Sequence, residues 1–382
     1  MNVSASGRHH QYRRLQPRVS HRVSPMTTAD HWSRTMITII AVIVVFSALY
    51  QASTLVAPVA GAIFIIAIVW PLQSRLQTHL PKLLALAIVI GATIAVFIVF
   101  ASLVSWGFGR IARALFAEAN RFQALYSQTT AWIESYGIAV AGVWADHFNV
   151  GWLLRAIQGI TARLNTTVSF WLVVVVYVVL GLLEVDDVKR KLLALRGNEA
   201  ARITLSASTT IAAKFRRYMF IRTLMSAATG FMVWALATVS GLQLTQEWGV
   251  VAFSLNYIPF IGPFIATLFP TLFALAQFEH WQSALIVFAC LNLIQFVIGS
   301  YIEPRVAGGA LAISPFLVLF SVFFWTYLWG IFGAFIGVPI SIAIVTLAAE
   351  HPSSRWLAVL LGAPPKEDPC QLATTSGTPP VV

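Results

Sequence analysis

Long apolar runs separated by short polar stretches dominate the chain between residues 36 and 349. The runs cover residues 36–72, 83–103, 168–183, 221–242, 250–276, 281–300 and 313–349. A helix of about 20 residues crosses the hydrocarbon core of a bilayer, which is about 30 Å thick. The first run is too long for one such helix, and polar residues interrupt it. We therefore predict a tight hairpin of two helices joined near residues 51–54, and about eight membrane segments in all.

Composition supports a membrane protein. Hydrophobic residues make up 58% of the 382 residues and charged residues only 10%, whereas soluble domains carry about 25% charged residues. Inside a bilayer each segment must satisfy its own backbone groups, which favours helices for continuous runs of this length. The predicted fold class is all-α, a polytopic transmembrane protein with an N-terminal hairpin and broken helices in its C-terminal half.

Polar regions flank and interrupt a transmembrane transporter domain at residues 36–350. An Arg-rich tail at residues 1–35 and a Pro- and Thr-rich tail at residues 351–382 are predicted to be disordered. Charges mixed with aromatic residues predict an amphipathic extramembrane insert at 104–166. A basic segment at 184–220 is predicted to form two amphipathic helices with a turn at Gly197 and Asn198.

The excess of positive charge, formally +11, lies mainly in the N-terminal tail and the 184–220 segment. Short loops rich in Lys and Arg stay on the cytoplasmic side of a membrane. With eight crossings, the N-terminal tail, the 71–82 loop and the 184–220 segment all fall on that side. We predict that both termini are cytoplasmic, that the protein lies in a bacterial inner membrane, and that membrane lipids, not nucleic acid, meet the basic residues.

The first of three unusual breaks lies inside the apolar run 250–276. Two prolines and a glycine follow two polar residues there, in the order Asn256, Tyr257, Pro259, Gly262 and Pro263. Proline removes a backbone donor, and unsatisfied backbone at membrane depth requires burial in protein or a wet cavity. A proline kink that only shapes packing is one interpretation. A discontinuous helix that lines a translocation path is the favoured one.

The second break holds the only Asp, Glu, Lys or Arg residues between His280 and Glu350, namely Glu303 and Arg305. Pro304 separates them and Gly308 follows. An ionisable residue at membrane depth is costly, which makes it a functional hypothesis. If the segment dips into the membrane, Glu303 and Arg305 are candidates for a gate pair or for a proton- or cation-sensitive site. At the surface they would be ordinary loop charges.

The third break lies in the last apolar run, which is again too long for one untilted helix. Pro315 stands near its start, and Gly330, Gly333, Gly337 and Pro339 interrupt it. The three glycines share a helical face, so they predict close packing of helices, with a flexible hinge as the second interpretation. Pro339 is expected to bend or split the helix.

No enzymatic motif accompanies these breaks. The sequence contains no phosphate-binding loop, no nucleophile elbow, no HExxH and no cysteine–histidine cluster. We therefore predict that the protein is not an enzyme, holds no cofactor and has no metal site.

The broken segments resemble the C-terminal signature of the autoinducer-2 exporter family of bacterial permeases. The matching elements are N-x-I-P-x-I-G-P at 256–263, P-R-x-x-G at 304–308, S-P at 314–315 and W-G-x-x-G-x-x-x-x-x-P at 329–339. The order of the spans agrees as well, over roughly residues 36–350. This resemblance implies secondary transport without ATP. Family members are linked to export of the quorum-sensing signal autoinducer-2, and others to Na⁺(Li⁺)/H⁺ antiport.

Three functions stay open from the sequence: export of a small organic solute, cation/proton antiport, and a membrane scaffold that does not transport. An antiporter needs a protonatable carboxylate, whereas a neutral solute needs hydrogen-bonding groups. The scarcity of acids in the apolar runs favours the solute, and glycine-rich faces are compatible with a homo-oligomer. The candidates for the substrate path or its gate are Asn256, Tyr257, Pro259, Gly262, Pro263, Gln295, Glu303, Pro304, Arg305, Gly308, Pro315, Gly330, Gly333, Gly337 and Pro339.

Overall fold

The computed structural model describes residues 28–118, parts of 121–136, and residues 150–195, 199–278, 280–307, 313–351 and 354–362. These residues are almost entirely helical, which confirms the all-α fold class. The helices are α1 (Thr28–Gln51), α2 (Ser53–Leu76), α3 (Lys82–Ala117), α6 (Val150–Ala194), α7 (Glu199–Val239), α8 (Thr245–Leu255), α9 (Ile261–Gln277), α10 (Trp281–Phe296), the π-helix η1 (Val297–Ile302), α11 (Glu303–Ala307), α12 (Pro315–Glu350) and α13 (Arg355–Leu361).

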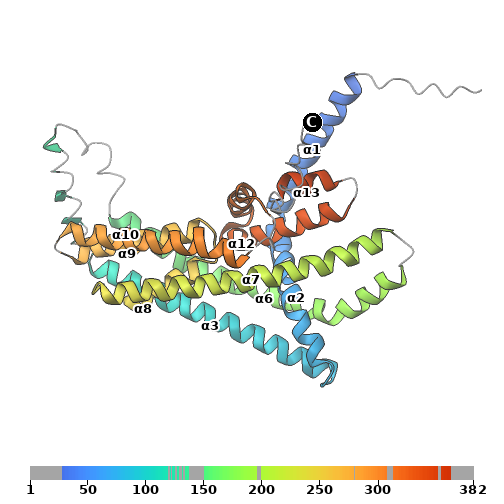
Figure 1. Cartoon of the computed structure of the whole chain (residues 1–382), viewed down its shortest axis with the longest axis horizontal. Coiled ribbons are helices and arrows are strands. Elements are labelled where there is room, and N and C mark those ends of the chain that lie inside the picture. Colours follow the sequence, from blue (N-terminus) through green and yellow to red (C-terminus); the bar gives the residue numbers. More distant parts are fainter. Residues whose placement is uncertain are drawn as a thin grey trace, which may run out of the picture. The chain divides into compact units, whose positions relative to one another are not determined.

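The chain divides into two compact units, Met1–Leu49 and Tyr50–Val382. The first unit contains most of α1. The second contains every other helix named above, and Figure 1 labels these helices except η1 and α11. A break at Ala52, between α1 and α2, confirms the predicted joint near residues 51–54.

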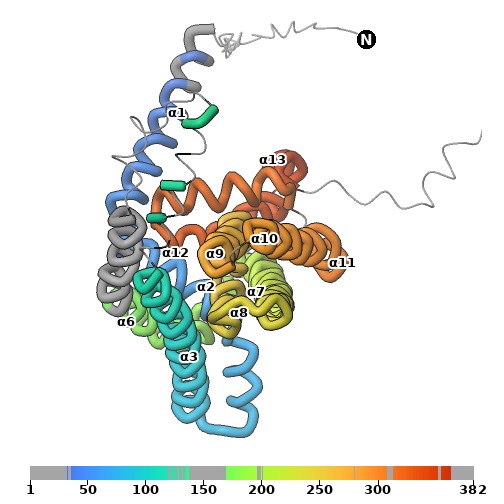
Figure 2. The backbone as a smooth tube through the Cα atoms, turned by 90° about the vertical axis from the view of Figure 1, so that its left-hand side faces the viewer, coloured from blue at the N-terminus to red at the C-terminus, as the bar shows by residue number. Residues whose placement is uncertain are grey.

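Eight apolar helical segments are present in the described part of the chain, as predicted. Six are long enough to cross a membrane: Ser53–Leu76, Lys82–Ala117, Ser169–Ala194, Ala201–Val239, Trp281–Ala307 and Pro315–Glu350. Two are shorter, Met36–Gln51 and Ile261–Gln277. Figure 2 shows the chain reversing direction between α2 and α3, at the predicted 71–82 loop.

The boundaries of the predicted polar regions need correction. The predicted insert at 104–166 starts inside α3 and ends inside α6, because both helices continue beyond their apolar runs. Most of the segment between them lies outside the described residues. The predicted turn at Gly197 and Asn198 lies outside the described residues, and the helices before and after it are extensions of the membrane helices α6 and α7.

Both predicted tails hold some helix. The last residues of the predicted N-terminal tail belong to α1, which begins at Thr28. The predicted C-terminal tail contains α13, whose Leu361 carbonyl accepts a hydrogen bond from the Ser314 amide at 3.3 Å. Residues 1–27 and 363–382 lie outside the described residues.

The predicted segment 250–276 is a helical hairpin rather than one helix. Residues 256–260 separate α8 from α9, and the end of α9 returns to the start of α8. There the Gln277 side chain accepts a hydrogen bond from the Gln243 amide and donates one to the Gly241 carbonyl, both at 2.8 Å. Trp248 and Phe273 face each other across the two arms, with ring centroids 5.7 Å apart. We call residues 245–277 the α8–α9 hairpin.

Helix α12 also folds back on itself. Trp329 and Gly330 have non-helical backbone angles, and Gly330 has a φ of 63° and a ψ of −144°. The hydroxyl oxygens of Ser321 and Ser341 lie 2.6 Å apart, whereas 20 residues of straight helix would extend about 30 Å. Residues 315–328 and 331–350 are therefore two antiparallel arms. We call residues 315–350 the α12 hairpin.

These two hairpins bear on the predicted number of crossings. In each, the second arm returns toward the start of the first, so each segment is a pair of antiparallel helices and not one straight span. Eight crossings and termini on one side of the membrane stay predictions.

The predicted split at Pro339 is wrong. The second arm of the α12 hairpin stays helical through Pro339, and the reversal occurs at Gly330 instead. A proline weakens a helix by removing one hydrogen bond, whereas Gly330 adopts backbone angles that other residues avoid. The backbone angles that Gly330 can adopt therefore decide where the chain turns.

Helix α7 is the central element of the larger unit, because it contacts α2, α6, α8, α10, η1, α11 and α12. Figure 1 shows it running alongside α8. Its contact with α2 depends on a proline. Pro71 has no amide hydrogen, which leaves the Ala67 carbonyl four residues earlier without its helical partner. Arg216 of α7 donates a hydrogen bond to that carbonyl at 3.0 Å.

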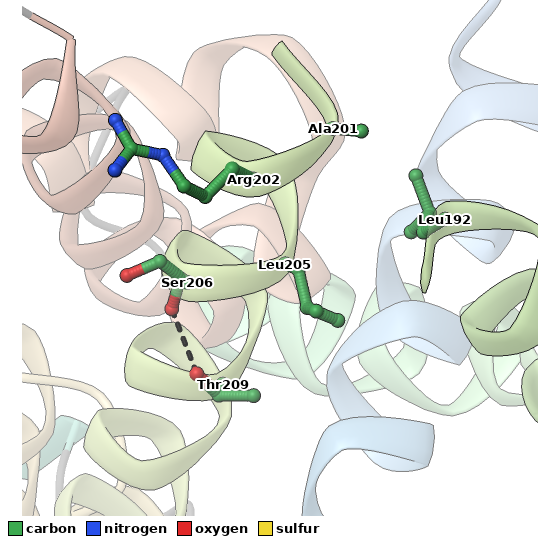
Figure 3. Close-up of a pocket in the computed structure, with 6 residues that line it drawn as sticks. All are labelled: Leu192, Ala201, Arg202, Leu205, Ser206 and Thr209. Carbon is green, nitrogen blue, oxygen red and sulfur yellow. Dashed lines mark hydrogen bonds between the residues drawn. The ribbon is translucent and has the colours of Figure 1, made fainter. Parts of the chain in front are cut away.

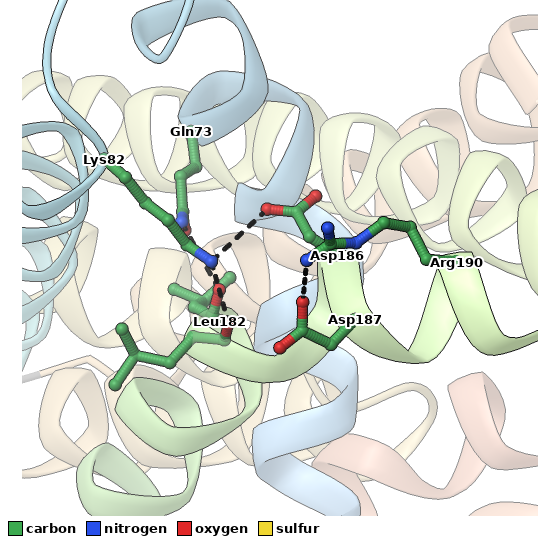
Figure 4. Close-up of polar contacts among 7 residues, drawn as sticks. Gln73, Lys82, Leu182, Asp186, Asp187 and Arg190 are labelled. Atoms are coloured by element: carbon green, nitrogen blue, oxygen red, sulfur yellow. Dashed lines mark hydrogen bonds and ion pairs between the residues drawn. The ribbon is translucent and has the colours of Figure 1, made fainter.

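Polar contacts also join the end of α2 and the start of α3 to the C-terminal part of α6 (Figure 4). The Lys82 ammonium donates a hydrogen bond to the Leu183 carbonyl at 3.1 Å and lies 3.7 Å from the Asp186 carboxylate. The buried Gln73 amide donates to the Leu182 carbonyl at 3.4 Å. These contacts place the 71–82 loop beside the start of the 184–220 segment, at one end of the molecule.

Candidate functional site

One face of α7 carries a stripe of buried polar side chains. Tyr218, Arg222, Ser226 and Thr229 follow one another at helical spacing, and each is at most 8% exposed. Polar groups in an apolar segment are costly unless they have partners. The positions of those partners show that this stripe is where the three sequence breaks meet.

The tip of the α8–α9 hairpin is hydrogen-bonded to this part of α7. The Asn256 amide donates a long hydrogen bond of 3.5 Å to the Ser226 hydroxyl, and both side chains are buried. The Tyr257 hydroxyl donates to the Thr223 hydroxyl at 3.1 Å. Two side chains from the first predicted break therefore attach the tip to α7.

The backbone explains why the first break has its particular residues. Phe260 has a φ of 63°, a left-handed conformation in which the chain reverses between the arms. Gly262 packs so closely on the Leu255 backbone that a Cβ there would overlap the Leu255 carbonyl. Pro263 lies in the first turn of α9, where a missing amide hydrogen costs nothing. Pro259 is buried in the tip itself.

The second break contacts the same stripe through Glu303. The Arg222 guanidinium lies 3.2 Å from one oxygen of the Glu303 carboxylate and 3.3 Å from the other. Glu303 thus pairs with Arg222 and not with Arg305, while the candidate role of the two residues in gating stays a prediction. The Arg305 guanidinium instead stacks on the Tyr301 ring, 3.8 Å from its centroid.

The third break approaches from α12. Tyr218 packs in one apolar cluster with residues of both arms of the α12 hairpin, including Val322 and Ile336. The ring of Phe335 lies 6.3 Å from the ring of Tyr257. The second arm of the α12 hairpin therefore contacts both α7 and the tip of the α8–α9 hairpin.

The three predicted glycines of α12 have two different structural roles. Gly333 and Gly337 face the first arm so closely that a Cβ on Gly333 would overlap the Trp325 carbonyl, and one on Gly337 would lie 2.9 Å from the Ser321 carbonyl oxygen. This confirms close packing at both positions. Gly330 has open space around it and provides the reversal instead.

The remaining predicted residues have structural explanations or lie elsewhere. Pro315 starts α12, where the Ser314 hydroxyl accepts a hydrogen bond from the Leu317 amide at 3.2 Å, as helix N-termini prefer. Pro304 occupies the second position of α11. Gln295 of α10 has a buried amide nitrogen that finds no partner among the described residues. Gly308 lies outside them.

Aromatic rings surround the tip of the α8–α9 hairpin. Tyr257 lies within 6.3 Å of Phe100, Phe253 and Phe335, measured between ring centroids. The hairpin tip therefore presents a few fixed polar groups within apolar walls, which is typical of sites for small organic molecules.

A separate cavity of ≈ 370 Å³ lies where α6 ends and α7 begins (Figure 3). Half of its lining residues are apolar, and Arg202, Ser206 and Thr209 are the polar members. Thr209 precedes Tyr218 by more than two helical turns, so this cavity is distinct from the site on α7. Among the described residues, no group of His, Cys, Asp and Glu side chains is arranged to hold a metal ion.

Comparison with known proteins identifies the family. Residues 39–352, which include all three breaks, match the family described as AI-2E family transporter. The chain belongs to this family. It is therefore a multi-pass membrane protein of a transporter family, which confirms the resemblance drawn from the sequence.

Relatives in the AI-2E transporter family extend over nearly the whole chain. The AI-2 transport protein TqsA of Escherichia coli is 24% identical over 327 residues, which cover 85% of this chain and 94% of TqsA. A Haemophilus influenzae protein, provisionally named a transport protein, is 24% identical over 347 residues, or 86% of this chain and 96% of its own length. A provisionally named transport protein of Borreliella burgdorferi is 35% identical over 159 residues, 41% of this chain and 44% of its own length.

Sequence reasoning missed the role of α7 in this AI-2E transporter. Arg222 stands at the end of a basic block, so it resembled one more charge that sets topology. One signal was available: Tyr218, Arg222, Ser226 and Thr229 lie on one helical face of an otherwise apolar segment. That periodicity marks a polar face turned toward other helices.

Proposed function

We propose that this protein is a secondary transporter that exports a small organic solute, such as autoinducer-2, across a bacterial inner membrane. The observation that carries the proposal is the meeting of two helix breaks, in the α8–α9 and α12 hairpins, and of the junction between η1 and α11 on the buried polar face of α7. Broken helices in membrane transporters commonly line the substrate site. The name of TqsA, an AI-2 transport protein similar along nearly its whole length, supports this choice of solute.

The proposed path runs between α7, the tip of the α8–α9 hairpin and the second arm of the α12 hairpin. Asn256, Tyr257 and Thr223 are the proposed hydrogen-bonding groups for the solute, with Phe100 and Phe335 as apolar walls. Because the Asn256 and Tyr257 side chains are bonded to α7 here, opening the path requires them to exchange these partners for the solute. Both termini on the cytoplasmic side and a homo-oligomeric assembly are part of the proposal.

Cation/proton antiport receives less support. It requires a carboxylate that binds Na⁺ and a proton in turn. The Glu303 carboxylate is paired with Arg222, and the Glu247 carboxylate is paired with Arg110 at 2.9 Å. A carboxylate paired with an arginine is a poor cation site, because the guanidinium repels a second positive charge. The scaffold alternative has no specific observation in its favour.

Reconstitution into proteoliposomes tests the proposal. We expect purified protein to accelerate movement of labelled autoinducer-2 across the vesicle membrane, and Asn256→Ala to reduce the rate more than it reduces folded yield. Parallel vesicles with a Na⁺ or Li⁺ gradient and an internal pH dye test antiport. If autoinducer-2 and a panel of other small organic solutes all remain on their starting side, solute export is wrong.

A further inference from the structure

Arg222 is buried with only part of its hydrogen-bonding capacity in use. Its side chain is 9% exposed, and the nitrogen NH1 makes both contacts to Glu303. The Nε atom is buried and has no partner among the described residues. Arginine usually binds a carboxylate through two parallel N–H groups. Glu303 contacts only one nitrogen of this guanidinium, so the Nε donor stays unused.

Two further polar atoms on the same face of α7 are in a similar state. The Tyr218 hydroxyl, one turn before Arg222, and the Thr229 hydroxyl, two turns after it, are buried without a hydrogen-bond partner in the described structure. Buried polar groups in folded proteins nearly always have partners. The Arg222 guanidinium lies 5.8 Å from the centroid of the Tyr218 ring, so Tyr218 is the orphaned donor that accompanies the buried charge. The two together indicate a place for a ligand that accepts hydrogen bonds.

The two charges of the Arg222–Glu303 pair are held very differently. Arg222 lies in the middle of the long helix α7, while Glu303 begins the short helix α11, directly after the π-helix η1. The Glu303 side chain is 26% exposed against 9% for Arg222. In the Arg110–Glu247 pair the acid is the buried member, because the Glu247 side chain is 5% exposed and the Arg110 side chain is 49% exposed. In the first pair, therefore, the cation is fixed and the anion is replaceable.

We propose that Arg222 and the Tyr218 hydroxyl form a binding site for an oxyanion, a carboxylate or phosphate group carried by the solute, and that Glu303 occupies it in the solute's absence. The solute's oxyanion takes the place of the Glu303 carboxylate and also engages Nε. Once Glu303 is displaced, the ion pair between Glu303 of α11 and Arg222 of α7 is lost. This inference rests on the proposed function only for the statement that the ligand is the transported solute. Among the small organic solutes of that proposal, it favours those with a carboxylate or phosphate group over autoinducer-2, which has neither.

Chemical rescue of a Glu303→Gln variant tests the site without any transport measurement. This variant leaves the buried Arg222 without its counter-charge, which is strongly destabilising for buried pairs. We expect its apparent melting temperature in a neutral detergent to fall, and sodium acetate or sodium phosphate to raise it by about 5 °C relative to sodium chloride of equal ionic strength. Acetamide, the neutral isostere of acetate, is expected to have no effect.

Three controls make the rescue specific. The double variant Arg222→Gln/Glu303→Gln lacks the cation and is expected not to respond to either oxyanion. Glu247→Gln exposes the partly solvated Arg110 instead, and is expected not to respond either. Arg222→Lys keeps the charge but loses the planar fork, so acetate should stabilise Arg222→Lys/Glu303→Gln less than Glu303→Gln.

The outcomes separate the site from the wider function. If Glu303→Gln and the double variant respond alike, or if Glu247→Gln responds as strongly, the oxyanion site is wrong even if the protein transports autoinducer-2. If Glu303→Gln does not fold, Glu303→Asp, whose shorter carboxylate reaches Arg222 poorly, replaces it with the same expectations. Rescue by acetate alone assigns the group to carboxylates, and rescue by phosphate alone assigns it to phosphates.

Discussion

The two helical hairpins reach the same place but are held there by different means. The α12 hairpin is fastened to itself: Gly333 and Gly337 bring its arms into backbone contact, and Ser321 and Ser341 join them at 2.6 Å. The tip of the α8–α9 hairpin is fastened to its neighbour, through Asn256 and Tyr257 to α7. The difference suggests separate duties, with α12 as a rigid wall and the α8–α9 tip as the element that can detach.

If this contrast holds, substitutions in α12 will mainly reduce stability, and substitutions at the α8–α9 tip will mainly alter transport. Both quantities are measurable on the same detergent-purified and reconstituted protein. Thermal melting followed by size-exclusion chromatography reports the first, and solute flux per folded molecule in proteoliposomes reports the second.

The largest effect is expected from Gly333→Ala. Its Cβ would overlap the Trp325 carbonyl, so the arms of the α12 hairpin would have to separate. We expect a loss of about 3 kcal/mol or more, seen as low folded yield and a lower melting temperature. The matched control is Gly91→Ala in α3, where a Cβ meets nothing within 4 Å and alanine should be neutral or slightly stabilising. Equal melting temperatures for the two variants would contradict the close contact of the arms.

Gly330→Ala should have the next largest effect. The substitution meets no atoms, but a φ of 63° with a ψ of −144° is a conformation that essentially only glycine adopts, and the strain costs about 1–3 kcal/mol. Gly330→Asn should be equally harmful. Among conformations with positive φ, asparagine tolerates only the left-handed helical region, where ψ is also positive. A melting temperature restored by asparagine would mean that the reversal has ordinary left-handed geometry.

Asn256→Ala tests the other half of the comparison. It removes the hydrogen bond to Ser226, whose buried hydroxyl loses a partner, at a cost of about 1–2 kcal/mol. We expect a modest change in melting temperature and a larger fall in solute flux per folded molecule. Ser226→Ala removes the same bond from the α7 side. A variant that melts early yet transports normally would make Asn256 a packing residue.

The smallest effect is expected from Tyr257→Phe. The aromatic contacts with Phe100, Phe253 and Phe335 remain, and only the hydrogen bond to Thr223 is lost, worth about 1 kcal/mol. The tip should then detach from α7 more readily, so the solute concentration for half-maximal flux should change while the melting temperature stays nearly constant. Tyr257→Leu, which also removes the ring, should reduce both and shows whether the aromatic cluster matters.

Much of this arrangement could be read from the sequence, and the reasons for the failures are physical. Prolines and glycines in apolar runs locate breaks, and those near residues 256–263 and 330 are present. At residues 303–305 the chain stays helical, because the π-helix η1 passes directly into α11. The direction of the chain after a break is not encoded locally, which is why two hairpins were predicted as crossings. Gly330 shares its spacing with Gly333 and Gly337, yet its role depends on a backbone angle. Glu303 was found by its charge, but its partner Arg222 is 81 residues away in the chain.

The hydrogen bond from Arg216 to the Ala67 carbonyl predicts which two positions vary together in related sequences. The Ala67 carbonyl is without its helical partner because Pro71 supplies no amide hydrogen, so the proline on α2 and the arginine on α7 form a pair 145 positions apart, as their residue numbers give. Exchanging Pro71 for alanine would give the Ala67 carbonyl a helical partner within α2, which would compete with the half-buried Arg216 for this acceptor. Among AI-2E transporters, the two positions should therefore vary together: where one lineage has lost the proline, the arginine should have been replaced as well.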